Sequence, residues 1–148
     1  MTTYTQIIYQ IVYSTRGNTD TLTAPNRPEL FKYMWGIIKE KKCHPYMING
    51  VENHLHIVTH LHPSVALADL VKDLKMASSY FINQKSLFKN FNGWQEGYGA
   101  FTYSIREKEK IINYVKNQEE HHKKQSYKEE YKDLLQEHGI DFDERYFI

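Results

Sequence analysis

The sequence predicts an α+β fold of the ferredoxin-like or RRM-like kind, an antiparallel sheet built in the order βαββαβ with two helices appended at the C-terminal end. Two observations predict this order. Four short stretches rich in β-branched and aromatic residues are bounded by turn residues, as strands are. Amphipathic stretches with apolar residues at helical spacing follow the first, third and fourth of them, and one more stands near the end of the chain.

The first strand and the first helix are predicted in the N-terminal third of the chain. Residues 4–15, YTQIIYQIVYST, are suited to a strand, and RGNTD then supplies turn residues. Pro28 opens the helical stretch RPELFKYMWGIIKEKK. Its apolar stripe, which we expect in the core, consists of Leu30, Phe31, Met34, Trp35 and Ile38.

A hairpin and a second helix follow. The runs CHPYMINGVE and HLHIVTHLH are suited to two strands joined by a turn around Asn49 and Gly50. Residues 64–85 then form a helical pattern, with Ser64 as the expected N-cap. The apolar side of this helix consists of Leu67, Leu70, Val71, Leu74 and Ala77.

The C-terminal part contains the last strand, WQEGYGAFTYS, and the two appended helices. A capping box formed by Ser104 and Glu107 predicts the start of the first appended helix. The second starts after Ser126 and ends near His138, where Gly139 stops it. We therefore expect a single domain over residues 1–148. Its predicted parts are a core (1–104), a helix (about 105–124) and a C-terminal helix with a tail (126–148).

The composition is that of an ordinary globular protein with a formal net charge of +1. Residues 1–104 hold 10 basic and 7 acidic residues, and the remainder holds 9 and 11, so a phosphate-binding surface would have to be a local patch. The residues proposed as phosphate contacts are Arg16, Lys72, Lys75, Lys85 and Lys89. Basic residues of this kind, however, more often simply face solvent.

Cysteine content and hydropathy predict the compartment. The single cysteine, Cys43, cannot form an internal disulfide, which agrees with a reducing environment. No apolar run approaches the roughly 20 residues that span a bilayer. We therefore expect a cytoplasmic protein that does not associate with a membrane.

The stretch NHLHIVTHLH, residues 53–62, contains four histidines at alternating positions. In a strand, His54 and His56 lie on the same face, close enough for two imidazoles to bind one metal ion. His60 and His62 form a second such pair. A single histidine in a strand is most often a partly buried polar residue. Four histidines on one face cost free energy of folding, because that face can then bury little apolar surface. Some of these histidines are therefore expected to bind a ligand.

A further ligand has to come from another element. The helix after the last strand reads IINYVKNQEEHH, in which Tyr114, Gln118 and His122 recur at i, i+4 and i+8 along one stripe. By itself this spacing is more typical of surface residues than of a site.

Three features in order carry a resemblance to a known family. They are ENHLHIV, the following helix ALADLVKDLKMASSYFIN, and the later block WQEGYGAFTYS with INYVKNQEEHH. Over nearly the whole chain, this pattern closely resembles the single-tyrosine transposases of the His-hydrophobe-His (HUH) endonuclease superfamily. Those enzymes mobilise small bacterial insertion sequences, and domesticated relatives act on repeated extragenic palindromes (REP).

The resemblance implies a site and a reaction. His54, His56 and Gln118 would be metal ligands and Tyr114 the nucleophile, whereas His60 and His62, at the far end of the strand, would be structural or adjacent to DNA. The metal would be Mg²⁺ or Mn²⁺, with Zn²⁺ as the competing assignment. The enzyme would be a homodimer, with active sites that two subunits can share. It would cleave and rejoin single-stranded DNA bearing a hairpin, through a 5′-phosphotyrosine.

The sequence departs from the family pattern at two places, and two other functions are possible for such a chain. Asn53 stands where relatives usually carry Asp, which would weaken metal binding if that residue orients His54. The loop TRGNTDTLTAP is poor in basic residues, so element transposase and palindrome-processing relative both stay open. A non-catalytic nucleic-acid-binding domain of the same fold is the alternative. A two-histidine phosphoesterase is disfavoured, because only His62-Pro63-Ser64 fits its motif.

Overall fold

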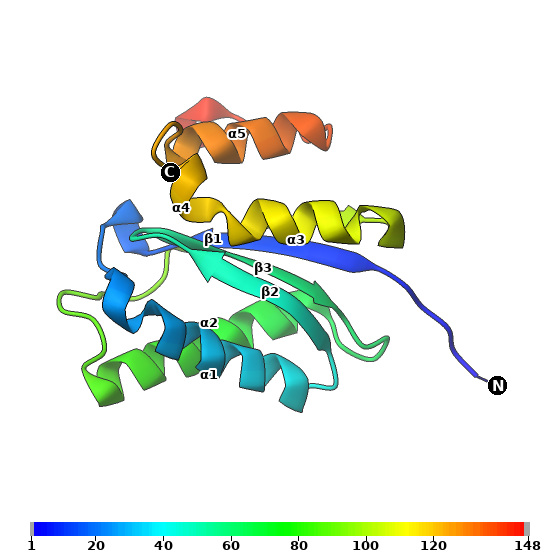
Figure 1. The fold of residues 1–148 in the computed structure, drawn as a ribbon, viewed down its shortest axis with the longest axis horizontal. Helices are drawn as coiled ribbons and strands as arrows, with labels where there is room; N and C mark the ends of the chain where they lie inside the picture. Colours follow the sequence, from blue (N-terminus) through cyan, green and yellow to red (C-terminus); the bar gives the residue numbers. More distant parts are fainter. Residues whose placement is uncertain (1, 147–148) are drawn as a thin grey trace.

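The computed structural model describes residues 2–146 and confirms the predicted fold class. A four-stranded antiparallel sheet has the order β2-β3-β1-β4, with helices on both faces (Figure 1). The strands are β1 (Ile8–Ser14), β2 (His44–Gly50), β3 (His54–His60) and β4 (Gly99–Tyr103). The α-helices are α1 (Arg27–Glu40), α2 (Leu67–Lys85), α3 (Lys108–Lys116), α4 (Gln118–His121) and α5 (Tyr127–Glu137). Short 3₁₀ turns cover Arg16–Asn18, Ala24–Asn26, Ile105–Glu107 and Glu144–Tyr146.

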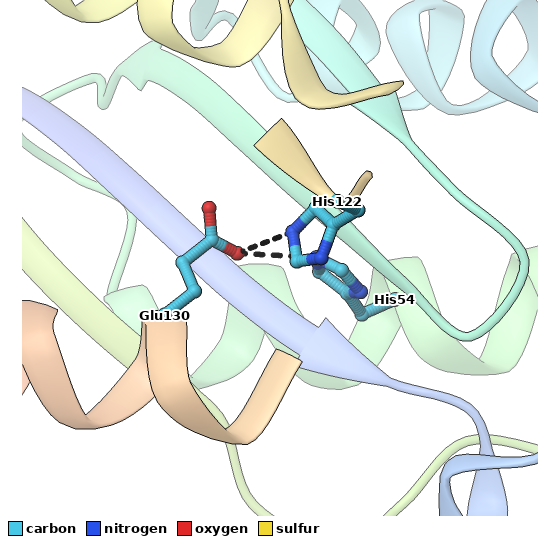
Figure 2. Close-up of side chains that lie close together, drawn as sticks. All are labelled: His54, His122 and Glu130. Carbon is cyan, nitrogen blue, oxygen red and sulfur yellow. Dashed lines mark hydrogen bonds and ion pairs between the residues drawn. The ribbon is translucent and has the colours of Figure 1, made fainter. Parts of the chain in front are cut away.

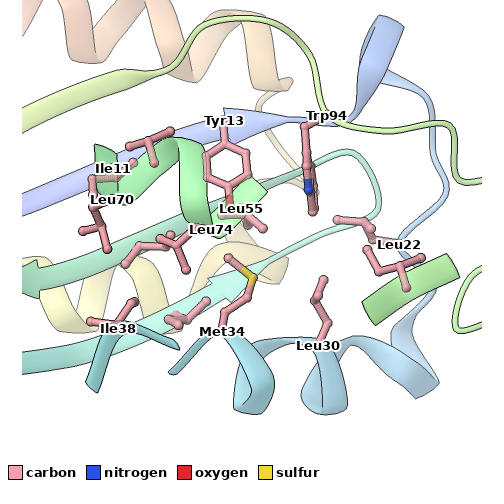
Figure 3. Close-up of a cluster of buried hydrophobic side chains, with 14 of the residues drawn as sticks. Ile11, Tyr13, Leu22, Leu30, Met34, Ile38, Leu55, Leu70, Leu74 and Trp94 are labelled. Carbon is pink, nitrogen blue, oxygen red and sulfur yellow. The ribbon is translucent and has the colours of Figure 1, made fainter. Parts of the chain in front are cut away.

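The main core lies between the sheet and the pair α1 and α2 (Figure 3). Odd-numbered residues of the central strands point into it, among them Ile11, Leu55 and Ile57. Leu30, Met34 and Ile38 of α1 are fully buried there, as predicted, whereas Phe31 and Trp35 are only half-buried. Each fully buried aliphatic side chain of this kind contributes about 1.5–3 kcal/mol to folding.

The opposite face of the sheet is covered by α3, α4 and α5, which lie above the sheet in Figure 1. Two smaller apolar clusters hold this layer in place. One joins Val12 and Phe101 of the sheet to α5, and the other joins Ile8 and Val58 to Ile111 and Val115 of α3. Because side chains alternate along a strand, His54, His56 and Gln10 also point toward this layer. The sheet thus has one structural face and one polar face beneath the appended helices.

Several predicted boundaries differ from the structure. The first strand begins at Ile8, later than predicted. Strand β4 is limited to Gly99–Tyr103, because the chain before it turns at Gly93 and Gly97, which have φ values of 90° and 88°. Trp94 retains only an isolated bridge to Thr15. The expectation that Ser64 caps the second helix was wrong. That helix begins at Leu67, and the Ser64 hydroxyl lies 2.7 Å from His62 Nδ1 instead.

The two appended helices are present, but the first is interrupted. The Ser104–Glu107 capping box exists and opens a 3₁₀ turn before α3. At Asn117 the backbone leaves helical geometry (φ −97°, ψ 24°), so that Gln118 starts the separate short helix α4. Helix α5 follows its own capping box at Ser126 and ends before Gly139, whose φ is 68°. Within the described residues, no helix has the length and apolar character needed to cross a bilayer.

Candidate active site

The β2–β3 hairpin places two histidines on the polar face of the sheet. His54 and His56 are fully buried, and their ring centroids are 5.3 Å apart. The predicted turn around Asn49 and Gly50 is displaced, because both residues belong to β2 and the chain turns at residues 51–53. The close approach of the two strands still depends on Gly50, where a Cβ atom would lie 2.4 Å from the His54 carbonyl oxygen. A larger residue at position 50 would therefore displace the start of β3.

Each of these histidines has a hydrogen-bond partner on its Nδ1 atom. His54 Nδ1 lies 2.8 Å from Asn53 Oδ1, an acceptor. Burial lowers the pKa of His54 to about 4, so the ring is neutral at pH 7 and carries one hydrogen. Asn53 accepts that hydrogen, which leaves the Nε2 lone pair free for a cation. On His56, the Gln10 amide donates to Nδ1 at 2.9 Å.

Helices α3 and α4 bring the predicted nucleophile and the predicted third ligand to the same place. The Gln118 side chain is fully buried, and its Oε1 lies 3.3 Å from His54 Nε2. The half-buried Tyr114 packs against His56 with ring centroids 6.0 Å apart. The structure thus gathers all four predicted site residues within one chain.

Glu130 of α5 stands at the centre of this group and was not anticipated from the sequence. Its Oε1 lies 3.2 Å from Nε2 of His54 and 3.0 Å from Nε2 of both His56 and His122. Figure 2 shows His54 and His122 beside this carboxylate. Its Oε2 accepts hydrogen bonds from the Tyr114 hydroxyl and, at 3.0 Å, from Gln118 Nε2.

Burial and the close contacts between these groups shift the pKa values of the carboxyl and the phenol in the site. Burial alone would favour the neutral form of Glu130, which is 1% exposed. The imidazoles around it, His122 first, outweigh burial and hold the pKa of its carboxyl well below the usual range. Burial and the neighbouring Glu130 carboxylate raise the pKa of Tyr114 above its ordinary value. The phenol therefore keeps its proton unless positive charge is brought to the site.

The donor atoms fit a divalent metal ion. Two ligands at right angles on an ion with bonds of about 2.1 Å lie about 3.0 Å apart. The Oε1 atom of Glu130 lies 3.0–3.2 Å from three imidazole nitrogens, and the ligand atoms of His54, His122 and Glu130 all fall within 4.8 Å of one another. Imidazole together with carboxylate and amide oxygen suits Mn²⁺ or Zn²⁺ better than Mg²⁺.

A cleft of about 310 Å³ runs between α3 and α5 and reaches Tyr114 and Glu130. Most of the charged groups that line it are carboxylates, from Glu107, Glu130, Asp133 and Glu137, with Lys110 as the basic one. The buried ligand atoms and this acidic lining disfavour the approach of a DNA phosphate to the histidines unless positive charge is also present.

The structure separates the remaining predicted residues from this centre. His60 Nδ1 lies 3.0 Å from the carbonyl oxygen of Ile7, and His62 bonds to Ser64, so neither joins the cluster. Lys72, Lys75 and Lys85 lie on α2, which covers the opposite face of the sheet. Lys75 donates to the carbonyl oxygens of Gln95 and Gly97, which is a structural role. Arg16, in the first 3₁₀ turn, and Lys89, in the loop after α2, are both exposed and lie outside the cluster.

Glu130 was not predicted from the sequence, and His122 was noted there without a role. One signal was present: Tyr127, Glu130 and Leu134 lie at i, i+3 and i+7 of a helix, so the carboxylate interrupts an otherwise apolar stripe. A charged residue on a buried stripe is a candidate for a specific partner.

Comparison with known proteins decides the family. The family model described as "Transposase IS200 like" matches residues 3–118. The chain belongs to the IS200-like transposase family. No protein of curated function matches its sequence.

Two solved structures share the fold of this IS200-like transposase. One is a presumed transposase from Deinococcus radiodurans R1, with 20% identity and a TM-score of 0.58 over 78% of this chain and 93% of that one. The other is a REP-associated tyrosine transposase bound to a REP hairpin, with 10% identity and a TM-score of 0.57 over 79% and 72%. Because α5 lies beyond residue 118, Glu130 falls outside the segment matched by the family model.

Proposed function

We propose that this IS200-like transposase cleaves and rejoins single-stranded DNA, with Tyr114 as the nucleophile. The observation that carries the proposal is the convergence of the Tyr114 hydroxyl, the two buried histidines of β3 and Gln118 on one point of a single chain. A tyrosine hydroxyl beside imidazole and amide groups that could hold a divalent cation matches what phosphodiester cleavage requires: a nucleophile and a means of neutralising phosphate charge.

The reaction replaces one ester by another. The Tyr114 oxygen attacks phosphorus, a bond from tyrosine to the 5′ phosphate forms, and the bond to the 3′ oxygen breaks. The hydroxyl proton lost by tyrosine balances the proton taken up by the 3′ oxygen. Because the phosphate remains an ester, a 3′-OH can later attack it and restore the strand without ATP.

His54, His56 and Gln118 would hold the divalent cation, Mg²⁺ or Mn²⁺ by the family resemblance. When bound, such an ion acts as a Lewis acid on the phosphate oxygens and favours the phenolate. The chain's own contribution is to orient: Asn53 directs the free Nε2 of His54 inward, and α3 presents Tyr114 beside His56. Because burial and Glu130 raise the pKa of Tyr114, positive charge at the site would favour attack by its oxygen.

We also propose that the substrate carries a subterminal hairpin and that the protein acts in the cytoplasm. The REP-associated structural neighbour is bound to a hairpin, and the fold of this chain is similar. Insertion-sequence transposition and processing of repeated palindromes both fit this chemistry. For the active sites of the expected homodimer, the convergence of all four residues within one chain favours sites that are not shared.

The test is covalent capture of DNA. A labelled single-stranded hairpin oligonucleotide is incubated with the full chain and Mg²⁺ or Mn²⁺, then run on a denaturing protein gel. We expect an adduct that is lost in Tyr114→Phe and His56→Ala. An adduct that persists in Tyr114→Phe would overturn the assignment. If the chain is instead a non-catalytic binding domain, the DNA is bound but no adduct forms, even in the unaltered chain.

A further inference from the structure

We propose that Glu130 and His122 belong to the metal-binding set, and that Glu130 also holds the Tyr114 hydroxyl beside it. The inference rests on the proposed function and extends its site by two residues that lie outside the matched family segment. The site then has three imidazoles, one amide oxygen and one carboxylate, gathered from β3, α4, the residue after α4, and α5.

The two oxygens of Glu130 divide between two tasks. Oε1 contacts Nε2 of all three histidines at 3.0–3.2 Å, which are the separations of neighbouring ligands on one ion. Oε2 accepts the Tyr114 hydroxyl and the Gln118 amide. One carboxylate therefore links the ligand set to the nucleophile, and a cation held by Oε1 would bring positive charge to the tyrosine.

The hydrogen bonds around His54 leave a place for a cation. A neutral imidazole has one N–H, and Asn53 Oδ1 accepts it at Nδ1. Nε2 then faces Gln118 Oε1 at 3.3 Å and Glu130 Oε1 at 3.2 Å without a hydrogen between them. Three acceptors that face one another in a buried site repel unless a positive charge lies among them.

His56 has to change one hydrogen bond to join the set. The Gln10 amide nitrogen donates to its Nδ1, which places the ring hydrogen on Nε2, toward Glu130. Rotation of the Gln10 amide by half a turn would present its oxygen to Nδ1 and free Nε2 as a ligand. Tyr103, whose hydroxyl now donates to Gln10 Oε1, can then accept from the rotated amide.

Helix α5 holds Glu130 at this point. The Tyr127 ring stacks on His54, with centroids 4.4 Å apart, and Leu134 is buried in the cluster beside β1 and β4. Glu130 lies between these two anchors on the same side of the helix. A carboxylate fixed in a buried site costs several kcal/mol unless charge partners surround it, so its position is best explained by a cation that it helps to bind.

Metal affinity and adduct formation test this inference together. Mn²⁺ is titrated into the full chain by isothermal calorimetry, and adduct rates are measured on the hairpin oligonucleotide. Glu130→Gln removes the charge with little change of shape, and we expect Mn²⁺ affinity and adduct rate to fall by about 10–100-fold. His122→Gln should weaken Mn²⁺ binding in the same range.

Two matched variants serve as controls. Glu40→Gln removes an exposed carboxylate from α1 on the opposite face of the sheet, and His44→Gln removes an exposed histidine outside the cluster; both should leave affinity and rate unchanged. If Glu130→Gln does not fold, Glu130→Asp keeps the charge but is too short to link His54 with Tyr114, and should show the same losses.

The outcomes separate the two proposals. Unchanged Mn²⁺ affinity in Glu130→Gln overturns the inference, and so does a faster adduct, which would show that the carboxylate blocks the phosphate instead of binding the metal. If the unaltered chain binds Mn²⁺ but never forms an adduct, the proposed function fails.

Discussion

Asn53 stands where the family resemblance led us to expect Asp, and the structure shows what the side chain contacts. Its Oδ1 accepts the Nδ1 hydrogen of His54, so the orienting role is retained without a charge. A carboxylate acceptor would make the imidazole a stronger ligand, because it stabilises the positive charge that develops on the ring.

We therefore predict that Asn53→Asp raises the affinity for Mn²⁺, by up to about tenfold, and that Asn53→Ala lowers it by a similar factor. Calorimetric titration of the three full-length chains measures both changes. Equal affinities in all three would mean that Asn53 does not orient His54. Thermal melting without metal should accompany the titration, to show that the variants fold.

At the level of single residues, the sequence predicted part of the cluster that the structure brings together, and the roles of these residues stay predictions. His54 and His56 were predictable because the alternation of a strand is local, and Tyr114 with Gln118 because helical spacing is local and the family resemblance identified them. Glu130 was not, since its role depends on how α5 packs against the sheet. That packing is a tertiary property which no local pattern encodes.

At the level of elements, α5 provides the acidic group of the site and covers its histidines. The helix is short, and its start is fixed by the Ser126 capping box, in which Ser126 Oγ accepts from the Glu129 backbone amide. Because Glu130 follows directly, the order of this first turn sets the position of the carboxylate. Stability of α5 and metal affinity should therefore be coupled.

Ser126→Ala tests this coupling. Loss of the N-cap should cost about 1 kcal/mol and lower Mn²⁺ affinity several-fold, because part of that free energy must be supplied when the helix is ordered by the metal. Ser79→Ala, on α2 at the opposite face, should leave the affinity unchanged. The measurements are denaturant unfolding and metal titration. A destabilised Ser126→Ala variant with unaltered affinity would show that α5 is not part of the site.

Element types were predicted better than element boundaries. All four strands and the long helices lie where periodicity placed them, but the break at Asn117 and the short β4 do not follow from it. Tyr114, Gln118 and His122 converge although the helix is interrupted, because α4 resumes directly after the break. The N-terminal shortening of β4 follows from backbone turns at two glycines, which the sequence only marked as irregular.

In the whole molecule, the two faces of the sheet differ: one packs the main apolar core, and the other carries the residues of the candidate site. Helices α1 and α2 cover the apolar face, and α3 to α5 cover the face with the histidines (Figure 1). Tyr114 and His54 meet the same Glu130 side chain within one chain. From the residues that the structure describes, we expect one chain to supply both the tyrosine and the histidines of its own site.

Mixing two inactive variants tests this point. Tyr114→Phe and His54→Ala chains are combined before addition of the hairpin oligonucleotide. Sites built within one chain predict no adduct from the mixture, because each chain lacks one essential group. Recovery of an adduct would show that the tyrosine of one subunit serves the histidines of another, as in the shared sites that the family resemblance allows.

Mapping of the modified peptide would show directly whether Tyr114 forms the bond to DNA. The full chain is reacted with the hairpin oligonucleotide and Mn²⁺, digested with trypsin and nuclease, and analysed by mass spectrometry. We expect the tryptic peptide of residues 111–116, IINYVK, to carry a nucleotide attached through its 5′ phosphate at Tyr114. A nucleotide on any other residue would show that Tyr114 is not the nucleophile, and so would an adducted chain in which this peptide is unmodified.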